Sequence, residues 1–146
     1  MEMTKQQIAQ SMRTFVDRRD ELLHEDDAAF EVHLNRFVDF CQNDPLVQKV
    51  LAPLVASNEF DVDAWWSALT SEEERGVKDL RLPSSSDGET AARFKIIETF
   101  VSDTNNRQVW RFGFLFGKRK LDESITIFRT IMIRPFADEL THRLGD

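Results

Sequence analysis

The sequence has few of the residues that covalent or cofactor chemistry requires. It contains one cysteine, Cys41, which excludes an intramolecular disulfide and a zinc cluster built from cysteines. It contains no tyrosine, so no phenol is present to act as an acid or base. None of its five glycines belongs to a phosphate-binding loop, because no Gly-Lys-Ser/Thr follows them. These absences predict no cofactor and no metal, and they favour a protein that is not an enzyme.

Long apolar runs are also missing. The richest stretches, 109–116 and 125–133, are interrupted by Arg111 and Arg129, and neither approaches the roughly 20 residues that cross a bilayer. The polar N-terminal residues do not have the basic start and apolar run of a signal peptide. With a lone cysteine, this pattern predicts a cytoplasmic protein that does not bind membranes. The segment 133–140 is similar to the closing helix of assorted bacterial helical proteins, so we expect a bacterial source.

Composition and charge point to a globular chain with two unlike halves. The 146 residues are 41% hydrophobic and 31% charged, which is typical of one globular domain. The formal net charge of −7 disfavours general coating by nucleic acid or anionic membrane. Residues 1–82 contain 17 acids and 9 Lys/Arg, whereas residues 83–146 contain 9 acids and 10 Lys/Arg. We therefore predict a single helical domain over 1–146, composed of an acidic helical half (1–82), a loop (83–88) and a neutral to basic helical half (89–146).

Apolar residues recur every three or four positions through most of the first hundred residues, which predicts helices. Thr4 and Gln7 form a capping box, and Asp44 is placed to cap a helix that begins at Pro45. Pro53 is expected to kink or end that helix. Helices are expected at about 5–23, from Pro45 to about 54 and near 89–102. A further helix with its stripe at 30–41 is capped by Asp26 or Asp27, and a short one that contains Trp65, Trp66 and Leu69 is capped by Asp61 or Asp63.

The final third of the chain supports two interpretations. Alternating aromatics from Trp110 to Phe116 and a β-branched run at 125–133 are typical of strands. A longer stripe from Leu121 to Leu144 keeps a helical period, with Asp122 as its N-cap and Pro135 as a kink. We favour an all-α bundle of five or six helices with a Pro-kinked C-terminal helix. The alternative is an α+β fold with a hairpin at about 109–133.

Two Glu-x-x-His pairs, Glu21 with His24 and Glu139 with His142, have the spacing that ferritin-like dimetal bundles use. At about 100° per residue, both pairs lie far from the apolar stripes of their helices. We therefore expect both pairs to face solvent and to bind no metal.

The segment from Arg19 to His24 has an Arg-x4-His spacing and resembles the short motif of HEPN-type ribonucleases. Those enzymes are helical and often dimeric, and their Arg and His meet at the dimer interface. The resemblance implies that Arg19 stabilises phosphoryl charge and that His24 acts as an acid or base.

The strongest candidate binding feature lies between residues 107 and 120, where five cations and several aromatics occur without an acid. Exposed tryptophans are typical interface anchors, so the pair at 65–66 joins the candidates. The predicted binding residues are Arg107, Trp110, Arg111, Lys118, Arg119, Lys120, Trp65 and Trp66. Gly113 and Gly117 in the same segment indicate either a close helix–helix approach or a helix C-cap at Gly117, and we favour the cap.

Three functions remain open from the sequence. We favour a non-enzymatic protein–protein interaction or assembly module, with a protein partner or a second copy of the chain as ligand. The first alternative is a helical HEPN-like ribonuclease that uses Arg19 and His24. The second is a nucleic-acid-associated helical subunit that uses the 107–120 basic patch, with weak binding expected from the overall negative charge.

Overall fold

The computed structural model describes residues 2–24, 26–101 and 107–145, apart from the side chain of Glu74, and these residues contain no strand. The prediction of an all-α fold is therefore confirmed. The α-helices are α1 (Lys5–His24), α2 (Phe30–Asn43), α3 (Pro45–Ala56), α4 (Val62–Thr70), α5 (Ser86–Val101), α6 (Arg107–Leu115), α7 (Leu121–Phe128) and α8 (Arg134–Leu144). Two 3₁₀ turns, η1 (Asp27–Ala29) and η2 (Glu73–Arg75), and a π turn, η4 (Arg129–Ile133), complete the described elements. In the same part of the chain, every helix is too short or too polar to cross a membrane.

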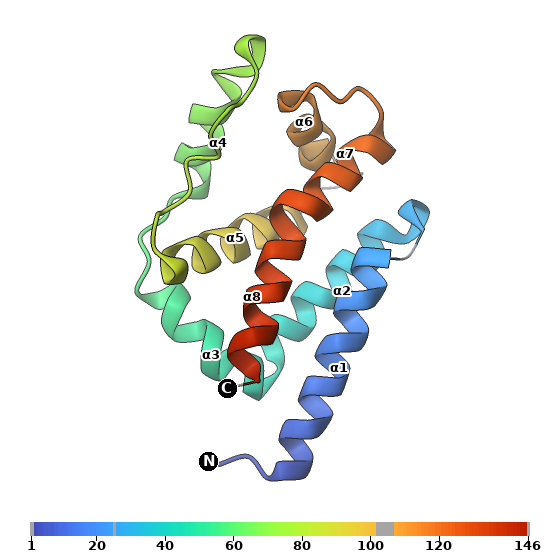
Figure 1. Ribbon diagram of the computed structural model, residues 1–146, viewed down its shortest axis with the longest axis vertical. Helices are drawn as coiled ribbons and strands as arrows, with labels where there is room; N and C mark the ends of the chain where they lie inside the picture. The colour runs from blue at the N-terminus through green and yellow to red at the C-terminus, as the bar shows by residue number, and fades with distance from the viewer. Residues whose placement is uncertain (1, 25, 102–106, 146) are drawn as a thin grey trace.

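The helices pack around the long C-terminal helical segment (Figure 1). Helices α1 and α2 form an antiparallel pair on one side of α8, and α5 crosses behind it. Helices α6 and α7 pack against each other at one end of the molecule, whereas both chain termini lie at the opposite end. This arrangement places α6 at the outer end of the bundle.

The core is dominated by phenylalanine. The largest fully buried side chains include six phenylalanines at positions 15, 30, 37, 112, 128 and 136. The ring of Phe128 stacks on Phe100 with centroids 5.1 Å apart and meets Phe30 edge-on at 6.5 Å. Such pairs stabilise packing by about 1 kcal/mol beyond burial of their area. These contacts connect the first half of the chain to the last helices.

The predicted helix starts of α1 and α3 are confirmed. The Gln7 amide donates to Thr4 Oγ1 at 3.0 Å, and the Thr4 amide donates to Gln7 Oε1 at 2.8 Å. Asp44 Oδ2 accepts from the amides of Leu46 and Val47, both at 3.1 Å, ahead of Pro45. Pro53 lies inside α3, and the helix continues past it to Ala56.

The alternative of a hairpin at about 109–133 is wrong, because these residues lie in α6, the following turn, α7 and η4. The four alternating aromatics form two pairs spaced i, i+4 on different sides of α6. Trp110 and Phe114 lie on the outer side with ring centroids 6.0 Å apart. Phe112 and Phe116 lie on the inner side at 5.1 Å. Four alternating aromatics are therefore compatible with a helix, in which they form two i, i+4 pairs, as well as with a strand.

The C-terminal stripe forms a continuous helical segment, in which the π turn η4 joins α7 to α8. The turn widens just before Pro135, which has no amide hydrogen for the carbonyl of Ile131. Arg93 Nε donates to that carbonyl instead, at 3.2 Å.

The expected N-cap at Asp122 is wrong, because α7 begins at Leu121 and Asp122 lies in its first turn.

Candidate interaction surface on α6

Helices α6 and α7 approach each other closely because one of them carries a glycine at the contact. A Cβ atom built on Gly113 would lie 1.8 Å from Ser124 Oγ and 2.7 Å from Ser124 Cα. Ser124 is fully buried, and its hydroxyl donates to the carbonyl of Trp110 at 3.3 Å. The interpretation of Gly113 as a close-approach residue is confirmed for contact within the chain.

Gly117 ends α6 with a left-handed backbone, at φ +80°. The Gly117 amide donates to the carbonyl of Phe114 at 3.1 Å, and the Lys118 amide donates to the carbonyl of Gly113 at 2.9 Å. These two bonds define a Schellman cap, so the predicted C-cap is confirmed. The cap turns the chain back, and residues 118–120 then lead directly into α7.

The outer face of α6 carries four exposed side chains at i, i+3, i+4 and i+7: Arg107, Trp110, Arg111 and Phe114. Trp110 and Phe114 are each 41% exposed, which makes them two of the four large apolar side chains exposed among the described residues. The indole Nε1 of Trp110 donates to the carbonyl of Arg119 at 3.2 Å, so the ring lies against the 118–120 turn. We define the α6 surface as Arg107, Trp110, Arg111, Phe114, Lys118, Arg119 and Lys120.

A shallow hollow of about 490 Å³ adjoins the exposed stripe. It is lined by the four outer residues of α6 and by Glu73 of η2. Segment 73–77 is attached to the end of α6, because the Val77 amide donates to the carbonyl of Leu115 at 3.2 Å. The hollow therefore lies between α6 and the 73–77 segment, which this hydrogen bond joins.

The charge of the α6 surface is poorly compensated within the chain. Only one of its five cations, Arg111, forms an ion pair with a described residue, and the distance to Glu73 Oε2 is 3.7 Å. Both side chains of that pair are well exposed, so water and salt weaken their attraction. The surface therefore combines apolar rings with cations that are available to an anionic ligand.

The two other predicted tryptophans lie elsewhere. Trp65 is buried, and its Nε1 donates to the carbonyl of Leu80 at 2.6 Å. Trp66 is half-buried and contacts the ring of Phe100 edge-on, with centroids 5.3 Å apart. Trp66 belongs to the packing of α4 on α5, whereas Trp65 connects α4 to the segment that contains Leu80.

Of the eight predicted binding residues, Arg107, Trp110 and Arg111 thus share one face of α6, and the 118–120 turn adjoins that face through the carbonyl of Arg119. Phe114 lies on the same face and was not among the predicted binding residues.

The Arg19–His24 motif lies on the last turns of α1. Arg19 Nη1 donates to Thr141 Oγ1 of α8 at 3.1 Å, and Arg19 Nε donates to Asp20 Oδ1 at 3.1 Å. His24 is exposed at the end of the helix, where a cation complements the helix dipole. The contacts of Arg19 fix α1 to α8.

Of the two Glu-x-x-His pairs, the first contains a residue, Glu21, whose surroundings differ from the prediction. Glu21 does not face solvent, because α2 covers that side of α1 and places His33 Nδ1 at 3.4 Å from the buried Glu21 Oε2. The Oε1 atom of Glu21 accepts from Arg18 at 3.1 Å. Across the described chain, His, Cys, Asp and Glu side chains form no group of three that could bind a metal ion.

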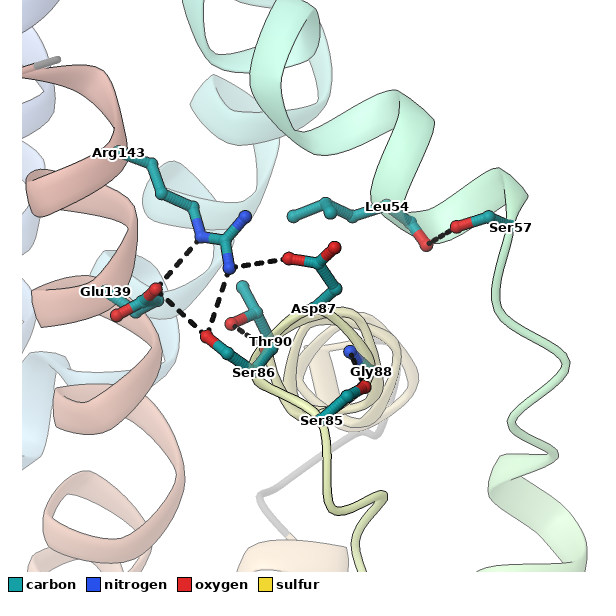
Figure 2. A network of polar contacts seen from close by, with 9 residues as sticks. All are labelled: Leu54, Ser57, Ser85, Ser86, Asp87, Gly88, Thr90, Glu139 and Arg143. Carbon is teal, nitrogen blue, oxygen red and sulfur yellow. Dashed lines mark hydrogen bonds and ion pairs between the residues drawn. The ribbon is translucent and has the colours of Figure 1, made fainter.

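A polar network connects the start of α5 to α8 (Figure 2). Arg143 Nη2 donates to Asp87 Oδ1 at 2.8 Å and to Ser86 Oγ at 3.1 Å, and Arg143 Nε donates to Glu139 Oε1 at 3.0 Å. The hydrogen bond that Arg143 donates to Asp87 raises the pKa of the guanidinium against the opposing effect of burial. The sequence missed this network because 83–88 reads as a loop, whereas α5 already begins at Ser86.

Cys41 is buried in the core. Burial raises the pKa of its thiol, and the negative charges of Asp44 and Glu98 raise it further. The thiol is therefore neutral at physiological pH and is a poor nucleophile.

Comparison with known proteins gave no match to a family model, a curated protein or a solved structure.

Proposed function

We propose that this chain is a non-enzymatic protein–protein interaction module and that the α6 surface is its binding face. The observation that carries the proposal is the pair of exposed rings, Trp110 and Phe114, between cations on one helix face. Tryptophan and arginine are enriched among residues that dominate interface energetics. Exposed apolar area beside unpaired charge does not stabilise an isolated chain. A bound partner would bury the apolar area and pair the charges.

Site-specific photocrosslinking in cells tests the proposal. A photoreactive phenylalanine analogue replaces Phe114 in one variant and Ile8 in a matched control. Ile8 is 38% exposed and lies on α1 near the N terminus, at the end of the molecule opposite α6 (Figure 1). The two probes therefore have similar exposure but sample different surfaces.

The expected result is one defined crosslinked protein at position 114 that is absent at position 8. The Trp110→Ala substitution, added to the position 114 probe, is expected to reduce the yield of that crosslink at least about tenfold. Equal, diffuse crosslinking at positions 114 and 8 would show that the α6 surface is not a binding face.

Nucleic acid is the second candidate ligand of the same surface, because the region 107–120 contains five cations and no acid. Single-strand binding combines phosphate contacts with stacking on aromatic rings, so it uses the same residue types. Counterion release predicts a steep fall in affinity with salt for an oligonucleotide. A salt titration with a labelled single strand distinguishes this candidate from the first.

The ribonuclease hypothesis has its own test. A helical nuclease that uses Arg19 and His24 would cleave mixed RNA, and His24→Ala would abolish the cleavage. No cleavage by the parent chain, or equal cleavage by the His24→Ala variant, would remove this hypothesis.

The proposal also covers the source, the compartment, the number of domains and the bend in the C-terminal helix that the sequence predicted. We propose a bacterial cytoplasmic protein in which residues 1–146 form one helical domain and Pro135 bends the C-terminal helix. Support for the compartment comes from the single cysteine, which forms no disulfide within the chain and is buried in the core. Limited proteolysis tests the single-domain expectation, because cleavage within 83–88 that releases two stable halves would contradict it.

A further inference from the structure

The charge and shape of the α6 surface indicate which kind of partner it fits, an inference that rests on the function proposed above. Arg107, Lys118, Arg119 and Lys120 form no ion pair with any residue that the structure describes, and Arg111 has only the long contact to Glu73. Arg107 and Arg111 share the outer face of α6 with the two exposed rings, and the 118–120 turn contacts Trp110 through the carbonyl of Arg119. Charge complementarity therefore calls for an acidic partner.

A second copy of the chain does not satisfy this requirement in a symmetric dimer. A two-fold dimer built on the α6 surface would place the same patch of each copy against the other. The cations of one patch would then face the cations of its equivalent, and like charges across an interface are unfavourable. A symmetric dimer therefore does not supply the acidic surface.

The geometry of the stripe favours a helix as the bound segment. The residues from Arg107 to Phe114 cover two turns, a length of about 10 Å along the axis of α6. They border a hollow of about 490 Å³ whose lining also includes Glu73 of η2. An amphipathic helix binds such a surface through apolar residues at i, i+3, i+4 and i+7.

We infer that the α6 surface binds an acidic amphipathic helix of a partner protein. Its apolar face packs on Trp110 and Phe114, and its flanking carboxylates reach Arg107, Arg111 and the cations of the 118–120 turn.

Single-stranded nucleic acid fits the same surface less well. The rings of Trp110 and Phe114 pack against each other at 42°, so they present one apolar ridge instead of two separate faces for successive bases. The indole N–H is bonded to Arg119 and is not available for a base or a phosphate.

Fluorescence anisotropy with labelled synthetic ligands tests the inference. The first peptide, of about 15 residues, carries leucines at i, i+3, i+4 and i+7 with glutamates beside them and a helix-stabilising staple. The second has the same composition in scrambled order, and the third replaces glutamate by lysine. A thymidine oligonucleotide of about 15 nucleotides represents nucleic acid. Each is titrated with the parent chain, the Trp110→Ala variant and the matched Ile8→Ala variant.

The expected result is saturable binding of the first peptide, at least about tenfold tighter than the scrambled and lysine peptides. Trp110→Ala weakens this binding about tenfold or more, whereas Ile8→Ala changes it less than about twofold. The inference is overturned if the first peptide does not bind at about 1 mM, if the scrambled peptide binds equally, or if the oligonucleotide binds more tightly.

The crosslinking experiment separates this inference from the proposed function. A defined crosslink at position 114 with no binding of the acidic peptide would leave the interaction module in place and remove the acidic helix as its ligand. Absence of any specific crosslink at position 114 would remove both.

Discussion

The close approach of α6 and α7 makes a quantitative prediction for the Gly113→Ala substitution. In an open helix, alanine in place of glycine raises the free energy of unfolding by about 1 kcal/mol. At this position the new Cβ would lie 2.4 Å from Ser124 Cβ and 2.7 Å from Ser124 Cα. Relief of this overlap requires the two helices to move apart, because neither of those Ser124 atoms is at the end of a flexible side chain.

Overpacking of this kind costs about 3 kcal/mol at the upper end of its usual range. Subtraction of the helix-propensity gain leaves a net loss of about 2 kcal/mol in the free energy of unfolding. For a chain of this size, that loss lowers Tm by about 4–8 °C. Urea unfolding followed by circular dichroism measures the change at constant m-value.

Two further variants make the test specific to the contact. Gly117→Ala places its Cβ in open space but at φ +80°, so it should cost only about 1 kcal/mol through backbone strain. Ser124→Gly in the Gly113→Ala background removes the two side-chain overlaps and should recover at least about 1 kcal/mol in a double-mutant cycle. Stabilisation of the chain by Gly113→Ala alone would refute the close approach.

Three other predictions concern the core, the polar network and the α6 surface. Burial raises the pKa of the Cys41 thiol in the folded chain, so this thiol loses its proton at a lower pH in the unfolded chain than in the folded chain. The free energy of unfolding should therefore fall above about pH 8.5, by up to about 1.4 kcal/mol per pH unit. Urea unfolding between pH 7 and 10 should show this slope to be shallower in Cys41→Ala, and equal slopes would contradict the prediction. Arg143→Met removes the bonds to Asp87 and Glu139 and should cost about 1 kcal/mol by thermal unfolding, less at high salt, whereas the same change at the exposed Arg134 should be nearly neutral. Trp110→Ala should lower the free energy of unfolding by about 2 kcal/mol, because its ring is 41% exposed and only the remainder of its area is packed, and a loss above about 4 kcal/mol would assign the ring to the core.

The elements that the sequence predicted well are those whose signals are local. The Thr4–Gln7 box and the Asp44–Pro45 start depend on residues within one turn, and the structure reproduces both. The Schellman cap at Gly117 is similarly local. Each of these contacts is formed by residues a few positions apart, so spacing alone is sufficient to recognise it.

The elements that the sequence missed depend on partners distant in the chain. Whether residue 110 faces out or in depends on the position of α7, which is set by the contact of Gly113 with Ser124. Glu21 was expected in solvent because its own helix gives no indication that His33 of α2 covers it. The wide turn before Pro135 likewise depends on Arg93, which lies 38 positions away from the carbonyl that it reaches.

The most direct test of the account is the affinity of the crosslinked partner for two matched variants of the purified chain. Isothermal titration calorimetry with Trp110→Ala should show a Kd at least about tenfold above that of the parent chain, and Ile8→Ala should leave the Kd within about twofold. Equal affinity of the partner for the parent chain and for Trp110→Ala would contradict the claim that the outer face of α6 is where this protein binds.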